Sequence, residues 1–473
     1  MRDSKLWSGL ALINHLQARL SGLLPDGVNG VSIDTRTLQR DDLFFAVKGE
    51  NSDGHDFVSA AFEAGAAAAV VDEAHADALK NTGALYIVDD VLASMENLGR
   101  AARARSGADI IAVTGSAGKT STKEALKIVL SQAGETHASV ASYNNHWGVP
   151  LTLARMPVAA RFGVFEIGMN HPGEITPLTA MVRPNVAIIT TIAPVHLAAF
   201  NSVDEIADAK AEIFSGLEPH GVAIINRDVP QFELMRSIAH HSQASEFLSF
   251  GESEDAGAHL LSLTDDNGQS IVEASILDTR VRYRLGAPGR HMAVNSLAVL
   301  LAARAVGMQV SDAAQALAHF QPPGGRGSRI ELPVGDGTII VIDESYNANP
   351  ASMRAALSLL GAAQVSGGGR KIAVLGDMLE LGQQESALHA GLVQSVEEAG
   401  VNQVYAAGPL MKNLFDALPQ ALRAGWNETS TGIKDALLDN VQAGDVIMIK
   451  GSNGSRMAPL IKALQQRFAP ADI

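Results

Sequence analysis

Cysteine is absent from the 473 residues of this sequence, which excludes disulfides and thiol chemistry and gives no sign of an oxidising compartment. Long apolar runs are also missing, since none approaches the roughly 18 residues that a membrane-spanning helix requires. Residues 1–20 lack the charged-then-apolar pattern of a secretory signal, because polar side chains interrupt them. We therefore expect a cytoplasmic protein without stable membrane association.

Basic residues are too few to balance the acidic ones. The sequence has 36 Lys and Arg against 51 Asp and Glu, a formal net charge of −15, and no basic block offsets it. A nucleic-acid partner is therefore not expected, and anionic ligands must be bound by local sites. With 47% hydrophobic and 18% charged residues the chain is expected to fold, and we expect a monomer.

Short apolar runs alternate with helical patterns along the whole chain, which predicts an α/β fold. A polar, alternating region at 252–285 predicts an antiparallel excursion from an otherwise parallel arrangement. The strands are expected at 43–47, 67–71, 85–88, 163–167, 186–192, 221–225, 338–342, 371–375, 404–407 and 445–449.

Two segments interrupt this pattern. One lies at 105–108, and the other is the Pro- and Gly-rich stretch 321–328, where neither a helix nor a central strand can continue. The length of the chain also suggests about three domains. The predicted domains are residues 1–107, 108–325 and 326–473.

Residues 114–123 follow a buried-strand pattern and open an amphipathic segment. Glycines let the backbone N–H groups face an anion, Lys119 supplies a full charge, and Thr120 offers a hydroxyl to Mg²⁺. The spacing is shorter than that of the common P-loop, because Val113 stands where that motif has its first glycine. A glycine-rich turn can simply cap a helix, but Gly-Lys-Thr-Ser after a strand favours nucleotide binding. The expected phosphate-binding residues are Gly115, Ser116, Ala117, Gly118, Lys119, Thr120 and Ser121.

Three residues beyond this loop suit a metal-dependent phosphoryl site. Glu166 lies at the end of an expected strand, where parallel sheets carry ligands, although a structural acid is the alternative. His196 follows the next strand, and a loop histidine alone is more often a surface residue. Lys210 lies on the apolar face of an expected helix at 203–217. Spacing leaves open whether Lys210 snorkels to solvent or reacts with CO₂ to form a metal-binding carboxylated lysine.

Further polar residues lie where a nucleotide or a second substrate would be bound. Asn295 lies in a segment that opens a helix and would suit a purine edge, although a plain helix entry would look the same. Arg326 lies in the boundary loop between two glycines, within reach of phosphates if two domains close. The polar cluster 343–350 ends an apolar strand and is either a turn or a ligand loop.

In this order, these motifs resemble those of the Mur ligases, ATP-dependent amide-forming enzymes of peptidoglycan precursor synthesis. The resemblance covers essentially the whole chain and accounts for the short loop spacing. It implies catalytic roles for Lys119, Glu166, His196 and Lys210. It also implies Mg²⁺ ligands at Thr120, Glu166, His196 and a carboxylated Lys210, and ATP contacts at Asn295, Arg326 and Glu344, where Glu replaces the more usual Asp.

Four stretches are similar to the family branch that adds D-alanyl-D-alanine to UDP-N-acetylmuramoyl-tripeptide, namely 144–153, 166–175, 345–353 and 375–382. The resemblance implies a central P-loop ATPase domain with a parallel sheet, an N-terminal UDP-substrate domain and a C-terminal Rossmann-like domain. The implied substrate-binding residues are Asp34, Thr35, Arg36, Asn144, Asn145, Tyr346, Asn347 and Asn349.

Three other functions share parts of this pattern. A folate-chain or cyanophycin-type ligase has the same ATP core, but it should lack the motifs at 34–36 and 346–349. A P-loop regulatory switch would hydrolyse nucleotide without an amine acceptor. A UDP-sugar-binding protein would have no use for Lys119.

Overall fold

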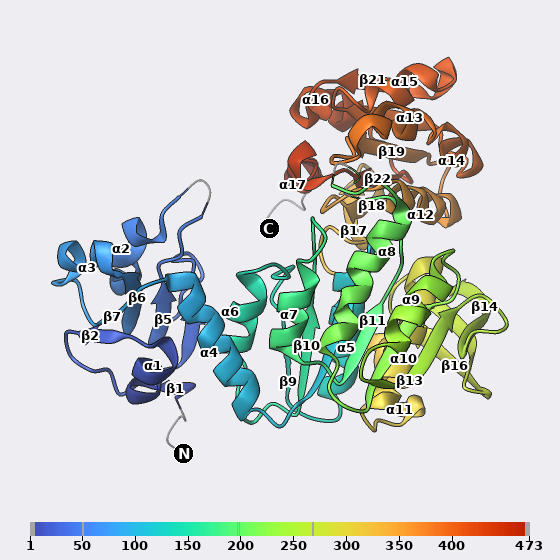
Figure 1. Cartoon of the computed structure of the whole chain (residues 1–473). Coiled ribbons are helices and arrows are strands. Elements are labelled where there is room, and N and C mark those ends of the chain that lie inside the picture. Colours follow the sequence, from blue (N-terminus) through green and yellow to red (C-terminus); the bar gives the residue numbers. More distant parts are fainter. Residues whose placement is uncertain (1–4, 50–51, 196, 198, 267–268, 469–473) are drawn as a thin grey trace.

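The computed structural model describes residues 5–49, 52–195, 197, 199–266 and 269–468, and these form an α/β structure with three main sheets. Each sheet comes from a separate stretch of sequence. Figure 1 shows the three units in blue, in green to yellow and in orange to red, with the C-terminal unit over one end of the central unit. The expected α/β class is confirmed. Within the described ranges, every helix is too short or too polar to span a membrane.

The N-terminal unit is built around a five-stranded sheet. Its elements are β1 (Trp7–Ser8), α1 (Gly9–Leu16), β2 (Arg19–Ser21), β3 (Gly27–Val28), β4 (Gly30–Ser32), β5 (Asp42–Phe45), α2 (Val58–Glu63), β6 (Ala68–Asp72), α3 (Glu73–Leu79), β7 (Leu85–Val88) and α4 (Val91–Arg105). The strand order is β2-β7-β6-β5-β4, and only the β2–β7 pair is antiparallel. Alternate residues of β5 face opposite clusters, Leu43 toward α1 and α4 and Phe44 toward α2 and α3.

The central unit contains the nine-stranded sheet. Its elements are β8 (Asp109–Thr114), α5 (Lys119–Ser131), β9 (Thr136–Ala138), α6 (Gly148–Ala154), β10 (Phe162–Glu166), α7 (Ile175–Val182), β11 (Val186–Ile189), α8 (Val203–Ala211), β12 (Gly221–Asn226), α9 (Phe232–His240), β13 (Ala244–Gly251), β14 (Ala258–Asp266), β15 (Gln269–Ile276), β16 (Thr279–Leu285), α10 (Arg290–Ala305) and α11 (Val310–Ala316). The strand order is β16-β15-β14-β13-β12-β11-β8-β10-β9.

Both faces of the central sheet are covered, which is why its inner strands are almost entirely apolar. Helices α5 and α10 pack on one face, and α6 to α9 pack on the other. The strands from β9 to β13 pair in parallel, whereas β14, β15 and β16 form antiparallel hairpins. The predicted antiparallel excursion is therefore confirmed. Because β11, β8 and β10 are adjacent and parallel, their carboxyl ends meet at one edge.

The C-terminal unit has a six-stranded sheet. Its elements are β17 (Ser328–Val334), β18 (Gly337–Glu344), α12 (Pro350–Ala362), β19 (Lys371–Gly376), α13 (Glu385–Ala390), α14 (Val393–Glu398), β20 (Gln403–Ala407), α15 (Lys412–Ala417), β21 (Arg423–Asn427), α16 (Ser430–Asn440), β22 (Val446–Lys450) and α17 (Ala458–Phe468). The order is β17-β18-β22-β19-β20-β21, with only β17–β18 antiparallel. Apolar clusters on both faces bury α12 and α14 on one side and α16 and α17 on the other.

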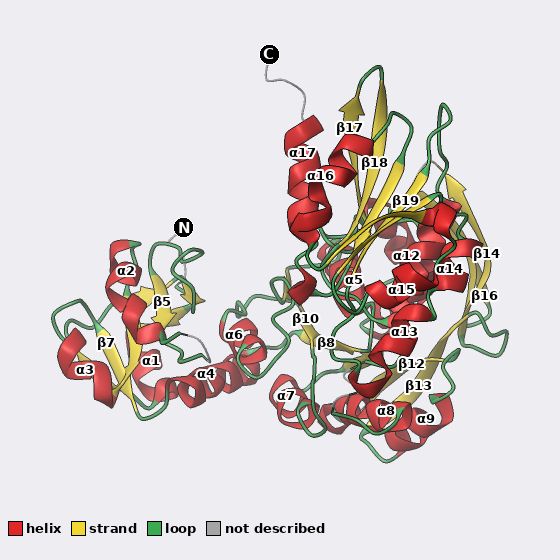
Figure 2. Ribbon diagram, turned by 90° about the horizontal axis from the view of Figure 1, so that it is seen from above, coloured by secondary structure: helices red, strands yellow, loops and turns green. Residues whose placement is uncertain are grey.

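Helices α4 and α6 lie between the N-terminal and central sheets, as Figures 1 and 2 both show. The indole of Trp7 donates to the carbonyl of Ala154 at 2.9 Å, and the Arg155 guanidinium donates to the carbonyl of Val31 at 2.6 Å. Leu151 and Ala154 of α6 also belong to the N-terminal apolar cluster. The N-terminal unit is therefore attached to the central unit through α6, at the end of the central sheet opposite to β14, β15 and β16.

Three expected elements end at least two residues earlier than the sequence pattern suggested, and the strand expected at 43–47 ends at Phe45. The strand expected at 186–192 ends at Ile189, and the hydroxyl of the next residue, Thr190, donates to the carbonyl of Ala117 at 2.5 Å. The helix expected at 203–217 is α-helical only to Ala211 and then continues as a 3₁₀ turn, Glu212–Gly216. That turn brings Gly216 so close to Thr179 that a Cβ would lie 2.4 Å from its carbonyl oxygen.

Candidate functional site

The phosphate loop lies between β8 and α5 at the carboxyl edge of the central sheet. Gly115 and Gly118 have φ angles of 148° and 83°, which glycine adopts readily and other residues avoid. A Cβ on Gly115 would lie 2.0 Å from Thr190 Oγ1, and one on Gly118 would lie 2.5 Å from Asn295 Nδ2. Asn295 of α10 therefore lies directly against the loop, and the start of α5 favours an anion there.

Side chains and neighbouring backbone hold this loop in shape. Lys119, the first residue of α5, donates from Nζ to the carbonyl of Gly115 at 2.6 Å. Burial lowers the pKa of Lys119, while the charge of Glu166 opposes that shift. The backbone N–H of Ser116 donates to the carbonyl of Thr191 at 2.8 Å. The loop is thus held by contacts within the protein itself.

Glu166 is a buried carboxylate at the end of β10, only 1% exposed. The Thr120 hydroxyl donates to its Oε2 at 2.7 Å, and the Asn144 amide donates to its Oε1 at 2.8 Å. A hydroxyl and a carboxylate thus converge beside the phosphate loop, and hard oxygen atoms of this kind are the ligands that Mg²⁺ prefers. The donor set fits the metal that the sequence suggests.

Lys210 lies on α8 and is 1% exposed. Its side chain therefore does not snorkel to solvent, which contradicts that alternative. Burial, aided by the positive charge of Lys119, lowers the pKa of Lys210 well below its ordinary value. A neutral amine is thus favoured at this position. The other residue expected beside it, His196, lies outside the described residues.

The boundary loop between the central and C-terminal units carries Arg326 into the site. Its Nη2 donates to the Ser142 hydroxyl oxygen at 3.0 Å, and that oxygen lies 3.2 Å from Thr120 Oγ1. The guanidinium also stacks over the ring of Tyr346, 4.1 Å from its centroid. Arg326 therefore lies between Ser142 of the central unit and Tyr346 of the C-terminal unit, and its contact with phosphates stays a prediction.

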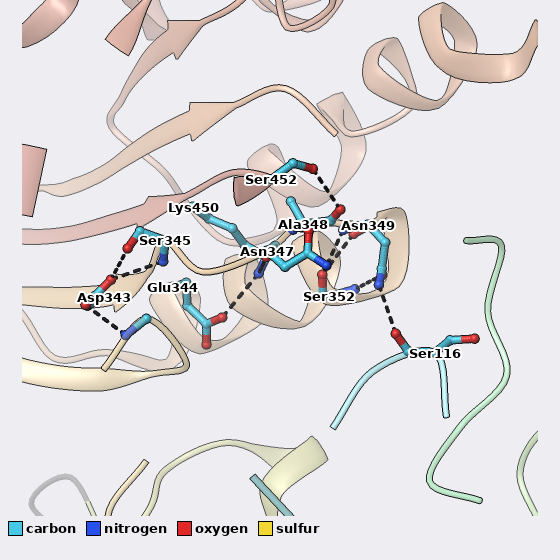
Figure 3. A network of polar contacts seen from close by, with 11 residues as sticks. Ser116, Asp343, Glu344, Ser345, Asn347, Ala348, Asn349, Ser352, Lys450 and Ser452 are labelled. Carbon is cyan, nitrogen blue, oxygen red and sulfur yellow. Dashed lines mark hydrogen bonds and ion pairs between the residues drawn. The ribbon is translucent and has the colours of Figure 1, made fainter. Parts of the chain in front are cut away.

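The loop after β18 reaches the phosphate loop through Asn349 (Figure 3). Asn349 Oδ1 accepts from the backbone N–H of Ser352 at 2.9 Å, which caps α12, while Nδ2 donates to the carbonyl of Ser116 at 3.4 Å. Pro350 at the first position of α12 is compatible with this cap, since it needs no N–H partner there. The C-terminal unit thus contacts the phosphate loop directly.

Lys450, at the end of β22, anchors the same loop from within the C-terminal sheet (Figure 3). Its Nζ donates to Glu344 Oε2 at 3.2 Å and to the carbonyl of Asn347 at 2.8 Å. Nearby, burial lowers the pKa of His291 on α10, against the influence of Glu344. The Glu344 carboxylate is therefore fixed by a cation and faces the central unit.

These groups surround one cavity of about 800 Å³ between the central and C-terminal sheets. Residues from the phosphate loop, the end of β10, α10 and the loop after β18 line it. Among the residues expected from the sequence, the lining includes Ser116, Ala117, Gly118, Lys119, Ser121, Asn144, Glu166, Asn295, Arg326, Glu344, Tyr346, Asn347 and Asn349.

The residues expected to bind the UDP substrate lie elsewhere, in the N-terminal unit. Asp34 accepts from the guanidinium of Arg36 at 2.7 and 2.9 Å, and this pairing lowers the pKa of Asp34. Thr35 lies in the turn between them. Asn145 has a local role, since its Oδ1 accepts from the Gly148 N–H at 3.0 Å at the start of α6.

Sequence reasoning missed three residues that support this site, namely Lys123, Ser142 and Lys450. Lys450 offered a signal, because it ends an apolar strand just as Glu166 does. Lys123 offered a weaker one, as a lysine one helical turn beyond Thr120. Ser142 offered none, since its importance comes only from two partners that are distant in sequence.

Three family models match consecutive parts of the chain. The Mur ligase family catalytic domain matches residues 27–132, the Mur ligase middle domain matches 113–303, and the Mur ligase glutamate ligase domain matches 328–453. Together they cover all three structural units.

Similar proteins match over nearly the full length. The UDP-N-acetylmuramoyl-tripeptide–D-alanyl-D-alanine ligase of Rickettsia prowazekii is 32% identical over 97% of this chain and 100% of its own. The Bacillus subtilis ligase of the same name is 33% identical over 92% and 93%. A crystal structure of MurF from Acinetobacter baumannii superposes with a TM-score of 0.83 and 28% identity, covering 97% and 99% of the two chains. The chain belongs to the Mur ligase family.

Proposed function

We propose that this protein is an ATP-dependent, ADP-forming ligase that joins UDP-N-acetylmuramoyl-tripeptide to D-alanyl-D-alanine in cytoplasmic peptidoglycan precursor synthesis. One observation carries the proposal. The phosphate loop and the loop at 343–349 face each other across a single cavity, so a nucleotide and an acceptor can meet there. The names of the curated relatives state these two substrates.

In this proposal each domain binds one reactant. Residues 1–107 bind the UDP substrate through Asp34, Thr35 and Arg36, residues 108–325 bind ATP, and residues 326–473 bring the dipeptide. The contacts of Arg326 and Asn349 with the central unit support a closed working state of the last two domains. The protein acts as a monomer, which light scattering after size exclusion would test.

The chemistry has two steps. A terminal carboxylate oxygen of the tripeptide attacks the γ-phosphorus of ATP, the bond from the bridging oxygen to that phosphorus breaks, and ADP leaves. The dipeptide amine then attacks the acyl-phosphate carbonyl carbon, phosphate leaves, and the amine loses a proton. Activation is necessary because a carboxylate is a poor acylating agent, whereas its phosphate anhydride has a good leaving group. The protein mainly positions the groups and stabilises charge.

Specific residues take these roles. Lys119 and Arg326 stabilise charge on the transferring phosphoryl group, Asn295 binds the adenine, and Glu344 contacts the nucleotide. Asn144, Asn145, Tyr346, Asn347 and Asn349 are the proposed substrate contacts. For Asn145 the support is sequence resemblance, since its side chain caps α6.

Mg²⁺ is expected to be held by Thr120, Glu166 and His196, and when bound it neutralises the β- and γ-phosphates. The buried Lys210 is proposed to be carboxylated, its neutral amine attacking CO₂ and losing a proton. The low pKa and burial of Lys210 support this, because only the neutral amine is nucleophilic. The resulting carbamate would return a negative charge near Lys119 and offer oxygen ligands to a second ion.

Phosphate release in a complete reaction, compared with reactions lacking one component, tests the proposal. We expect release to require ATP, Mg²⁺, UDP-N-acetylmuramoyl-tripeptide and D-alanyl-D-alanine together. Phosphate release with glutamate in place of the dipeptide and a folate in place of the UDP substrate would instead indicate a folate-chain ligase. Release that continues without any amine acceptor would contradict a ligase and support a nucleotide switch.

A further inference from the structure

Lys123 is a fully buried lysine that the proposed reaction does not use. It lies on α5, one turn beyond Thr120, with 0% of its surface exposed. Its Nζ donates to the carbonyls of Ser139 and Ala141, both at 2.7 Å, and lies 2.7 Å from Glu124 Oε1. A buried charge is costly unless it is paired in this way. The pairing therefore calls for an explanation beyond packing.

The partners of Lys123 belong to the loop at 139–145, which links β9 to α6. Within this loop Ala141 has a φ angle of 48°, a left-handed conformation that residues with a Cβ adopt reluctantly. Lys123 binds the carbonyl of Ala141 itself. The lysine thus stabilises a strained turn, and such turns persist where the surrounding structure fixes them.

This loop presents three polar groups to the nucleotide side of the site. Ser142 Oγ contacts Thr120 Oγ1 at 3.2 Å and accepts from Arg326 at 3.0 Å. The Asn144 amide donates to Glu166 Oε1 at 2.8 Å. At the start of the loop, Ser139 Oγ accepts from the backbone N–H of Glu166 at 3.2 Å. The contacts of Thr120 and Glu166 with this loop therefore depend on the conformation of the loop.

Direct contact with substrate is not the role of Lys123. Its Nζ points to backbone carbonyls at 139 and 141, and the side chain does not line the 800 Å³ cavity. Packing alone would need only an unbranched apolar chain such as methionine. The three oxygen atoms around Nζ are what distinguish a lysine at this position.

We propose that Lys123 is a positioning residue that locks the loop at 139–145, so that Ser142 and Asn144 hold Thr120, Glu166 and Arg326 in place for the metal–nucleotide complex. This inference rests on the proposed function. It adds a residue outside the ligand-contacting set, and it predicts that metal use, rather than dipeptide binding, depends on that residue.

Lys123→Met tests the inference, with Lys127→Met as the matched control, because Lys127 is exposed on the same helix one turn further on. We expect Lys123→Met to raise the Mg²⁺ concentration for half-maximal phosphate release about 10-fold and to lower kcat about 10- to 100-fold, the usual cost of removing a residue that orients metal ligands. KM for D-alanyl-D-alanine and the behaviour of Lys127→Met should stay normal. A folded Lys123→Met protein with a normal Mg²⁺ requirement would overturn the inference.

Ser142→Ala is the second test, because it removes one hydroxyl that the loop directs toward Thr120 and Arg326 and leaves Lys123 in place. It should reproduce the higher Mg²⁺ requirement, and the double variant should be no worse than Lys123→Met, since the Ser142 contacts depend on the loop that Lys123 holds. If Lys123→Met does not fold, as judged by its Tm, Ser142→Ala alone decides, and a normal Mg²⁺ requirement rejects the inference.

The two proposals fail in different ways. If wild-type protein releases no phosphate in the presence of the dipeptide, the proposed function fails. Calorimetric titration with ADP, with and without Mg²⁺, then still tests Lys123, because the Mg²⁺-dependent gain in ADP affinity should be lost in Lys123→Met and kept in Lys127→Met.

Discussion

The carboxyl edge of the central sheet and the corner of the N-terminal sheet at 34–36 are organised in opposite ways. At the central edge, Glu166 is 1% exposed and both of its oxygens already accept hydrogen bonds. At the N-terminal corner, the Arg36 side chain is 85% exposed and paired with Asp34, two residues away. One set of charges is buried and held by neighbouring side chains, and the other is an ion pair at the surface.

This difference corresponds to two uses of charge. Fixed dipoles and charges in a buried site stabilise a transition state without reorganising, and so they affect the rate of the chemical step. An exposed ion pair contributes little to stability because water screens it. We therefore expect the central edge to control kcat and the N-terminal corner to control KM for the UDP substrate, and four substitutions test that division.

Lys119→Ala should have the largest effect. Its Nζ donates to the carbonyl of Gly115 within the phosphate loop, where we propose that it meets the transferring phosphoryl group. Removing this charge should lower turnover by about 10³-fold, the upper range for the loss of one preorganised stabilising group. Phosphate release measures turnover, and an unchanged Tm shows that the variant is folded. A loss below about 10-fold would mean that the loop is not the catalytic phosphate site.

Glu166→Gln should come next, because it keeps the shape of the side chain and removes its charge. The Thr120 hydroxyl and the Asn144 amide both donate to this carboxylate, whereas a glutamine amide can accept from only one of them and must donate to the other. We expect kcat to fall about 100-fold and the Mg²⁺ requirement to rise. Normal Mg²⁺ dependence in a folded variant would place the metal elsewhere.

Lys210→Ala should lower kcat about 100-fold if a carboxylated lysine binds metal. Added short-chain carboxylic acids should restore part of the rate, since the shortened side chain leaves space for a free carboxylate. Lys119→Ala treated with the same acids is the control and should not recover. Failure of every acid to restore activity would reject carboxylation and leave Lys210 as a buried neutral amine.

Most of the fold was predictable from local sequence pattern. Apolar runs located the central strands because parallel strands buried on both faces are continuously apolar, as in Gly221–Asn226. The two larger errors, beyond Ile189 and beyond Ala211, lie where residues contact distant groups, as Thr190 and Gly216 do. The hydroxyl of Thr190 reaches the phosphate loop, and no local pattern encodes that.

Candidate site residues were predictable from two kinds of signal, namely a motif, as in the phosphate loop, and a charged residue within an apolar pattern. Glu166 and Lys210 were found because a charged residue in an apolar pattern demands a reason. Lys123 was missed because a lysine on an amphipathic helix usually faces solvent. Its partners lie at 139 and 141, in a loop whose position cannot be predicted from the pattern of the helix. Which face of α5 is covered is decided by tertiary packing.

Arg36→Ala should have the smallest effect, and it separates substrate binding from catalysis most clearly. The guanidinium is exposed and pairs with Asp34, which is only two residues away in the sequence. Its removal should therefore leave Tm nearly unchanged. Loss of one charged contact to the UDP substrate should raise KM for that substrate about 10-fold with kcat preserved, as expected for an interaction made equally in the ground state and the transition state. Arg40→Ala, a nearby exposed arginine, is the matched control and should behave as wild type. A fall in kcat for Arg36→Ala at saturating substrate would mean that the N-terminal corner also positions the reacting carboxylate, and that the division between binding and catalysis does not follow the boundary between the two sheets.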